Sequence, residues 1–231
     1  MTETKAGLNA DSAAVPGIGF IVLCLAAVVV LVGSQLADKP PAAAVAKLVA
    51  SSSFLAVALI SGALRSNYGR ILLGGLVLSG FGDMFLLGRG EAMFLAGLVS
   101  FLLAHVAYVV AFAYHGLNDK WSIAAVLPIA AISIVVSIWL TPHLPESMVV
   151  PVRAYTLVIS LMVITAFGAR GAGGPLLIPF GAVLFYLSDL SVASLQFTSP
   201  EFPNYVWGLP FYYTGQLMLA SSVRYAKPKN R

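Results

Sequence analysis

Eight apolar segments, each close to 20 residues long, follow one another with only short polar breaks between them. A helix needs about 20 mostly apolar residues to cross the hydrocarbon core of a membrane. An open strand edge cannot exist there, because its backbone groups would lack hydrogen-bond partners. The pattern therefore predicts an all-α, polytopic membrane bundle of eight transmembrane helices. The predicted spans are roughly 17–36, 43–64, 70–88, 92–114, 121–140, 149–168, 175–197 and 205–226.

The composition agrees with this architecture and excludes other classes of protein. Of the 231 residues, 59% are hydrophobic and only 10% are charged, whereas about a quarter of the residues in soluble domains are charged. The net charge of +4 lies mostly in loops and in the tail "RYAKPKNR", where phospholipid is a natural counter-charge, so it does not indicate nucleic-acid binding. The single cysteine, Cys24, excludes an intrachain disulfide.

The basic residues predict an orientation. With the N-terminus inside, nine lysines and arginines fall on the inner side and four on the outer side, as the positive-inside rule requires. We therefore expect both termini to be cytoplasmic, with the protein in the inner membrane of a bacterium. The expected organisation is a cytoplasmic segment at 1–16, one eight-helix membrane domain at 17–226 and a cytoplasmic basic tail at 227–231.

The chain also resembles itself, which indicates an internal repeat. The rare polar residues inside the spans align in pairs: Lys47 with Arg153 and Asp83 with Asp189 at a shift of 106, and His105 with Gln216 at a shift of 111. The chain is therefore predicted to contain two four-helix halves, about 17–115 and 121–226. Because four is even, the halves would run parallel, and parallel repeats place their shared site between them.

Asp83, in "GFGDMFLLG", and Asp189, in "FYLSDLSVA", are the strongest candidates for a functional site. A carboxylate at this depth costs several kcal/mol unless it is paired, hydrated or protonated, so such acids are functional candidates. The alternative is a structural role, in which the aspartates pair with Lys47 and Arg153 or form a helix–helix hydrogen bond. Lys47 and Arg153 could instead extend outward to the membrane surface.

The other polar residues have two interpretations each. His105 and Gln216 are either part of the site or satisfied core residues. Tyr155 lies about 200° around the helix from Arg153, so the two cannot point the same way, and Tyr155 is either an interface anchor or a site residue. The three histidines lack any HxxxH or HExxH spacing, so neither a metal site nor another cofactor is expected.

Several motifs resemble the YhhN-like lysoplasmalogenase family, from about Lys39 to Ser222. They are "GDMFLLG…FLAGLVSFLLAHVAYVVAF", "RAYTLVISLMVITAFGA", "GAVLFYLSDLSVASLQF" and "YYTGQLMLASS". The resemblance implies eight spans and hydrolysis of the vinyl ether bond of lysoplasmalogens, which releases a fatty aldehyde and glycerophosphoethanolamine or glycerophosphocholine. Asp83 and Asp189 match the two intramembrane aspartates of the family. Its other polar motif positions match Tyr155, His105 and Gln216.

The chemistry of a vinyl ether suggests roles for these residues. The bond breaks when an acid protonates the carbon β to oxygen, so a protonated carboxyl and a nearby anion are required, as in glycosidases. We expect Asp83 and Asp189 to be that acid/base pair, with the assignment of the two roles left open. The expected substrate-binding residues comprise Lys47 or Arg153 for the phosphate, His105, Gln216 and Tyr155 for water and the glycerol hydroxyl, and Phe101, Phe185 and Tyr212 along the alkenyl chain.

Other functions fit the same features. The expected partners are a lysophospholipid substrate and membrane lipids. A small-molecule or lipid transporter, or a scramblase with proton-titrating aspartates, would use the same repeats and polar site. A non-catalytic lipid-binding or scaffold protein is a further alternative, and the oligomeric state is not predicted.

Overall fold

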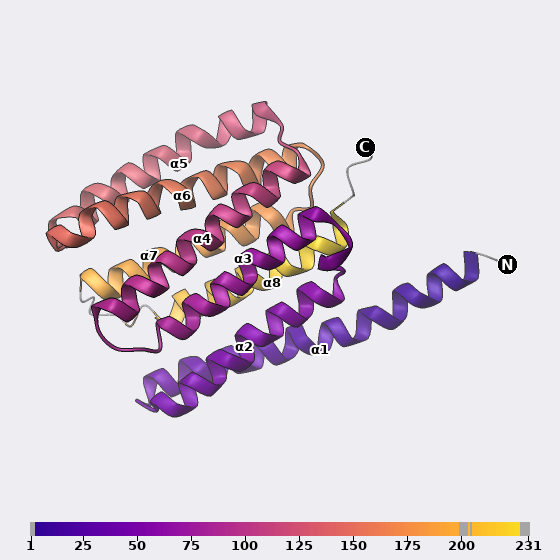
Figure 1. The fold of residues 1–231 in the computed structure, drawn as a ribbon, viewed down its shortest axis with the longest axis horizontal. Helices are drawn as coiled ribbons and strands as arrows, with labels where there is room; N and C mark the ends of the chain where they lie inside the picture. The colour runs from indigo at the N-terminus through magenta and orange to yellow at the C-terminus, as the bar shows by residue number, and fades with distance from the viewer. Residues whose placement is uncertain (1–2, 199–202, 204, 227–231) are drawn as a thin grey trace.

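The computed structural model describes the backbone of residues 3–198, 203 and 205–226, with side chains described from Gly17 onward. Within these residues the chain is all-α (Figure 1). The helices are α1 (Glu3–Leu36), α2 (Pro40–Ile60), α3 (Asn67–Phe85), α4 (Glu91–His115), α5 (Asp119–Leu140), α6 (Glu146–Gly171), α7 (Leu177–Phe197) and α8 (Tyr205–Tyr225). Short 3₁₀ turns lie at Ala63–Arg65 and Thr141–His143.

Apart from the first helix, the helix boundaries lie within four residues of the predicted spans. That helix begins at Glu3 rather than at 17. Hydropathy predicts only the apolar part of a helix, which here starts at Gly17, whereas helical backbone hydrogen bonding can begin earlier in the chain. In the connection that follows α2, Gly62 has φ +90°, a left-handed conformation that glycine adopts without strain. The side chain of Ser66 then caps α3, accepting a hydrogen bond from the backbone N–H of Gly69 at 3.0 Å.

Six of the described helices are long and apolar enough to cross a membrane, which makes this an integral membrane protein. They are Gly17–Leu36 within α1, then α2, α4, α5 with its following turn, α6 and α7. The two remaining helices, α3 and α8, lie in the middle of the bundle (Figure 1). The packed faces of these two helices carry glycine and polar side chains, such as Ser79 and Asp83 in α3 and Gly215 and Gln216 in α8, all of which are buried.

The helices run along a common axis and alternate in direction (Figure 1). One edge of the bundle is formed by α5 and α6 and the other by α1 and α2, with α3, α4, α7 and α8 between them. The most extensive contacts join neighbours in sequence, α1 with α2, α3 with α4 and α7 with α8. The first four helices contact the last four mainly through α4 with α6 and α8 with α2.

Glycines allow the central helices to approach one another closely. A Cβ added to Gly215 in α8 would lie 2.9 Å from the carbonyl oxygen of Gly181 in α7. A Cβ added to Gly75 in α3 would lie 2.5 Å from Cε1 of Tyr108 in α4. Small residues at helix contacts permit such packing in membrane proteins, and at Gly75 the packing partner is itself a buried polar side chain.

This packing gives a test with a neighbouring control. We expect Gly75→Ala to destabilise the protein by about 1–3 kcal/mol, because the new methyl group must displace the buried Tyr108 ring. Gly74→Ala meets nothing within 4 Å and should leave stability unchanged or slightly increased. Thermal unfolding in detergent measures both variants, and equal melting temperatures would contradict the packing described.

Candidate active site

One cavity of about 380 Å³ contains both intramembrane aspartates. Residues from all of α1 to α8 line it, and most of the wall is apolar. Asp83 lies two residues before the end of α3, and Asp189 lies eight residues before the end of α7. The two acids that the sequence places in separate halves therefore face a common space.

Asp83 lies in a site that satisfies a negative charge. Its side chain is buried, and Oδ2 accepts hydrogen bonds from Ser51 Oγ at 2.6 Å, Tyr212 OH at 3.0 Å and Tyr213 OH at 3.2 Å. Lys47 Nζ lies 3.5 Å from Oδ1. Three hydroxyl donors and one ammonium group suit an ionised carboxylate, which accepts hydrogen bonds and donates none.

Lys47 is turned into the protein rather than toward the membrane surface. It is only 7% exposed, and its Nζ is also within 3.5 Å of the backbone carbonyl oxygen of Asp83. Lys47 thus forms an ion pair with Asp83. This pairing is the structural role that the sequence analysis gave as the alternative to a functional one. The charge of Lys47 is neutralised by Asp83, although its side chain still contributes to the cavity wall.

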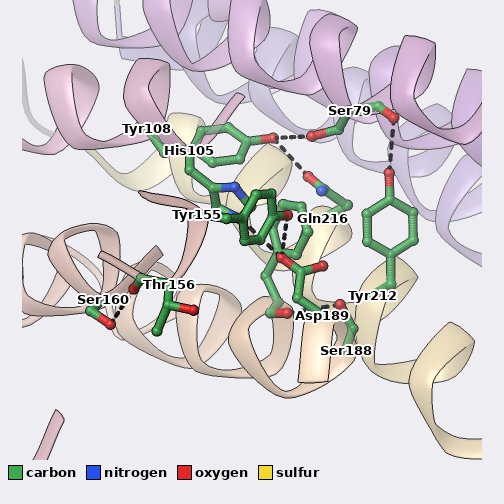
Figure 2. A network of polar contacts seen from close by, with 11 residues as sticks. Ser79, His105, Tyr108, Tyr155, Thr156, Ser160, Ser188, Asp189, Tyr212 and Gln216 are labelled. Carbon is green, nitrogen blue, oxygen red and sulfur yellow. Dashed lines mark hydrogen bonds and ion pairs between the residues drawn. The ribbon is translucent and has the colours of Figure 1, made fainter. Parts of the chain in front are cut away.

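Asp189 has a different environment in the same cavity. Tyr155 OH donates a hydrogen bond to its Oδ2 at 2.6 Å, and His105 Nε2 lies 3.4 Å from the same oxygen (Figure 2). Its side chain is 15% exposed. In the described part of the chain, Asp189 has no lysine or arginine partner. It therefore lacks the ammonium group that lies beside Asp83.

His105 and Gln216 are fully buried behind the cavity wall. Tyr108 OH donates to Gln216 Oε1 at 2.8 Å and lies 3.2 Å from Ser79 Oγ (Figure 2). The ring of His105 packs 4.5 Å from that of Phe185, centroid to centroid. Among the described residues, Nδ1 of His105 and the amide nitrogen of Gln216 lack a well-aligned hydrogen-bond partner, and Nε2 of His105 faces the Asp189 carboxylate at 3.4 Å.

The remaining predicted residues divide into two groups. Tyr155, Tyr212 and Phe101 line the cavity. Arg153 is exposed and does not line the cavity, and Phe185 is buried outside the lining, against His105 and Tyr212. Arg153 points out of the bundle while Tyr155 faces the cavity, as expected from the angle of about 200° between them around the helix.

Three polar residues of the site were not predicted from the sequence. Ser51 and Tyr213 bind Asp83, and Tyr108 binds Gln216. Ser51 follows Lys47 by four residues, a spacing that puts both on one face of a helix, so this signal was available. Within the described residues, no group of three or more His, Cys, Asp or Glu side chains is placed to hold a metal ion.

The ion pair leads to a double-mutant test. Lys47→Met should destabilise the protein by about 3–5 kcal/mol, because it leaves the Asp83 carboxylate buried without its cation. Adding Asp83→Asn to this variant should restore much of the loss. The exposed Arg153→Met control should change the free energy of unfolding by less than about 0.5 kcal/mol. Additive losses in the double variant, measured by unfolding in detergent, would contradict the pairing.

Comparison with known proteins agrees with the motifs. The YhhN family model matches residues 42–223, which is most of the chain. Lysoplasmalogenase TMEM86B of Homo sapiens is 33% identical over 165 residues, covering 71% of this chain and 68% of the relative. Lysoplasmalogenase TMEM86A of Bos taurus is 29% identical, covering 64% of this chain and 62% of the relative.

A bacterial relative is similar to the same degree. The lysoplasmalogenase of Mycobacterium bovis is 32% identical over 151 residues, covering 62% of this chain and 57% of the relative. The matches thus cover about two thirds or less of the length of these relatives, and no solved structure matches the chain. The extent of the family match shows that this chain belongs to the YhhN family.

Proposed function

We propose that this protein is an intramembrane hydrolase that cleaves the vinyl ether bond of lysoplasmalogens. The products would be a fatty aldehyde and glycerophosphoethanolamine or glycerophosphocholine. The observation that carries the proposal is the presence of two aspartates with contrasting surroundings in one largely apolar cavity. The lysoplasmalogenase names of its relatives support the same reaction.

We assign Asp189 as the general acid and Asp83 as the general base. Asp83 faces Lys47 and three hydroxyl donors, so its ionised form is stabilised. Asp189 faces the Tyr155 hydroxyl group and an imidazole but, among the described residues, no lysine or arginine. Without a strong counter-charge the neutral acid is favoured in an apolar site. Tyr155 donates to Oδ2 of Asp189, which leaves Oδ1 to carry the transferable proton.

The first chemical step would transfer this proton to carbon. Asp189 protonates the vinyl carbon β to the ether oxygen, and the adjacent carbon becomes an oxocarbenium ion. The hydrogen bond from Tyr155 stabilises the carboxylate that forms on Asp189. A water molecule then adds to the cation and transfers one proton to Asp83, which yields a hemiacetal. Lys47 remains beside Asp83 throughout and offsets the negative charge of the ionised form.

The second step would restore both carboxyl groups. The Asp189 carboxylate accepts the proton of the hemiacetal hydroxyl group, while Asp83 donates its proton to the departing glycerol oxygen. The carbon–oxygen bond breaks, and the aldehyde and the glycerophospho-alcohol are released. Asp189 is again protonated and Asp83 again ionised, so no external acid, base or cofactor is consumed. His105 and Gln216 lie behind the cavity wall, so we propose that they position cavity residues, with His105 Nε2 3.4 Å from the Asp189 carboxylate, instead of contacting water or the glycerol hydroxyl group directly.

The cavity wall and the exterior would contact different parts of the lipid. We propose that the alkenyl chain lies along the apolar wall, where Phe101 and Tyr212 are exposed to the cavity. Arg153, which is exposed outside it, would contact phosphate groups at the membrane surface. This placement replaces the substrate-phosphate role that was expected for Lys47, whose charge is paired with Asp83.

We also propose that α3 and α8 cross the membrane, giving eight spans. The candidate spans α2 and α4 run in the same direction (Figure 1), so the chain must return across the membrane between them, and α3 makes that return. The start of α1 and the end of α8 lie at one end of the bundle. With the excess of basic residues on that side, this supports the proposal that both termini face the cytoplasm, in the inner membrane of a bacterium.

The contacts of the two aspartates support the proposed two-half repeat. Asp83 in α3 is contacted from α2 of its own half and from α8 of the other half. Asp189 in α7 is contacted from α6 of its own half and from α4 of the other half. Each acid is thus held by the second helix of its own half and the fourth helix of the opposite half, as a twofold relation requires.

Single substitutions of the two acids test the proposed reaction. Asp83→Asn and Asp189→Asn should each lower turnover of a lysoplasmalogen by at least about 10²–10⁴-fold, because each removes a proton-transfer group. Asp119→Asn, at an exposed aspartate in the first turn of α5, is the matched control and should retain activity. Aldehyde release by the purified protein in detergent measures the turnover, and near-normal release by either cavity variant would contradict its role.

A further inference from the structure

A second cavity, of about 540 Å³, adjoins the active-site cavity. It lies where the connection from α3 to α4, the connection from α5 to α6 and the end of α7 meet. The two cavities share part of their walls, because the same residues line both: Leu86, Phe94, Gln196 and Phe197. A ligand in the first cavity can therefore have a neighbouring group in the second.

The described wall of the second cavity includes one carboxylate. Of its described lining residues, Glu91 is the only aspartate, glutamate, lysine or arginine. His143, Ser147 and Gln196 add polar groups to the wall. Arg89, two residues before Glu91, does not line the cavity. A recess with a carboxylate and without a lysine or arginine favours a cationic group over an anionic one.

Aromatic rings in the shared wall suit the same kind of ligand. Phe94 and Phe197 meet edge to face, with ring centroids 5.8 Å apart. The faces of aromatic rings attract organic ammonium groups, including quaternary ones. An ammonium group in this cavity would therefore have a carboxylate and two aromatic rings within its wall.

We propose that the second cavity binds the ammonium group of a zwitterionic lysophospholipid headgroup, with Glu91 as its counter-charge. The inference rests on the proposed function, because the ligand is the lipid whose ether bond occupies the first cavity. Ethanolamine and choline headgroups both carry the required cation. Lysophospholipids with an uncharged glycerol headgroup have only the negative phosphate and bind less tightly beside Glu91.

Binding of an uncleavable lipid tests this site. Saturated 1-O-alkyl glycerophosphoethanolamine and 1-O-alkyl glycerophosphoglycerol lack the vinyl double bond, so they are bound but not consumed. Their Kd values for the full chain are measured by calorimetry in a nonionic detergent that contains no other phospholipid, so that no other lipid headgroup competes for the cavity. The wild-type protein should bind the ethanolamine lipid more tightly.

Two changes at Glu91 should alter this preference. Glu91→Gln should weaken binding of the ethanolamine lipid by about threefold, and Glu91→Lys by about tenfold or more, because charge reversal adds repulsion. Binding of the glycerol lipid should be unchanged or tighter in both variants. Glu146→Lys is the matched control, since Glu146 also begins a helix at this end of the bundle but lines neither cavity.

The outcomes separate this proposal from the one on which it rests. An unchanged ratio of the two Kd values in both Glu91 variants would overturn the headgroup site. Equal effects of Glu91→Lys and Glu146→Lys would overturn it as well, because general surface charge would then account for the change. Failure of the wild-type protein to cleave lysoplasmalogen would contradict the proposed hydrolase, whereas the binding result would still decide the role of Glu91.

Discussion

The ion pair between Lys47 and Asp83 is the interaction on which the rest of the site depends. An isolated charge in an apolar bundle is strongly unfavourable, so the carboxylate of Asp83 requires partners. They come from α2, through Lys47 and Ser51, and from α8, through two tyrosine hydroxyl groups. The same contacts hold α2, α3 and α8 together, which ties the stability of the bundle to the charge that the proposed chemistry needs.

The contrast between the two acids has an origin in the sequence. At the shift that aligns His105 with Gln216, Tyr212 and Tyr213 of α8 align with Phe101 and Leu102 of α4. The helix that approaches Asp83 thus supplies two hydroxyl groups, whereas the helix that approaches Asp189 supplies none at those positions. A repeat that was chemically symmetric would give two equivalent acids. Divergence at these two positions makes one acid site strongly favourable for an anion and leaves the other less so.

Much of this architecture could be predicted from the sequence, because the length of each apolar segment and the few polar residues within it can be read locally along the chain. The helices follow from the spans themselves, and so does the placement of Asp83 and Asp189 inside them. The placement of the Lys47 side chain could not be predicted, since the depth of a residue along a helix does not determine whether a lysine extends to the membrane surface or turns inward. Arg153, its counterpart in the proposed repeat, is exposed, so the two basic residues have different environments despite their alignment.

The partners of the acids were harder to predict for a related reason. Tyr212 and Tyr213 are adjacent in sequence and both reach Asp83, a convergence that depends on how closely α8 approaches α3. A sequence does not specify which faces of two helices meet. The second cavity could not be predicted either, because connections distant in sequence form its wall.

The protonation states of the two aspartates are the central claim, and infrared difference spectroscopy measures them directly. A protonated carboxyl group has a carbonyl stretching band that an ionised carboxylate lacks. For the unliganded protein near neutral pH, we expect this band to disappear in Asp189→Asn and to persist in Asp83→Asn. Loss of the band in Asp83→Asn with its retention in Asp189→Asn, or its absence from the wild-type protein, would contradict the assignment of acid and base.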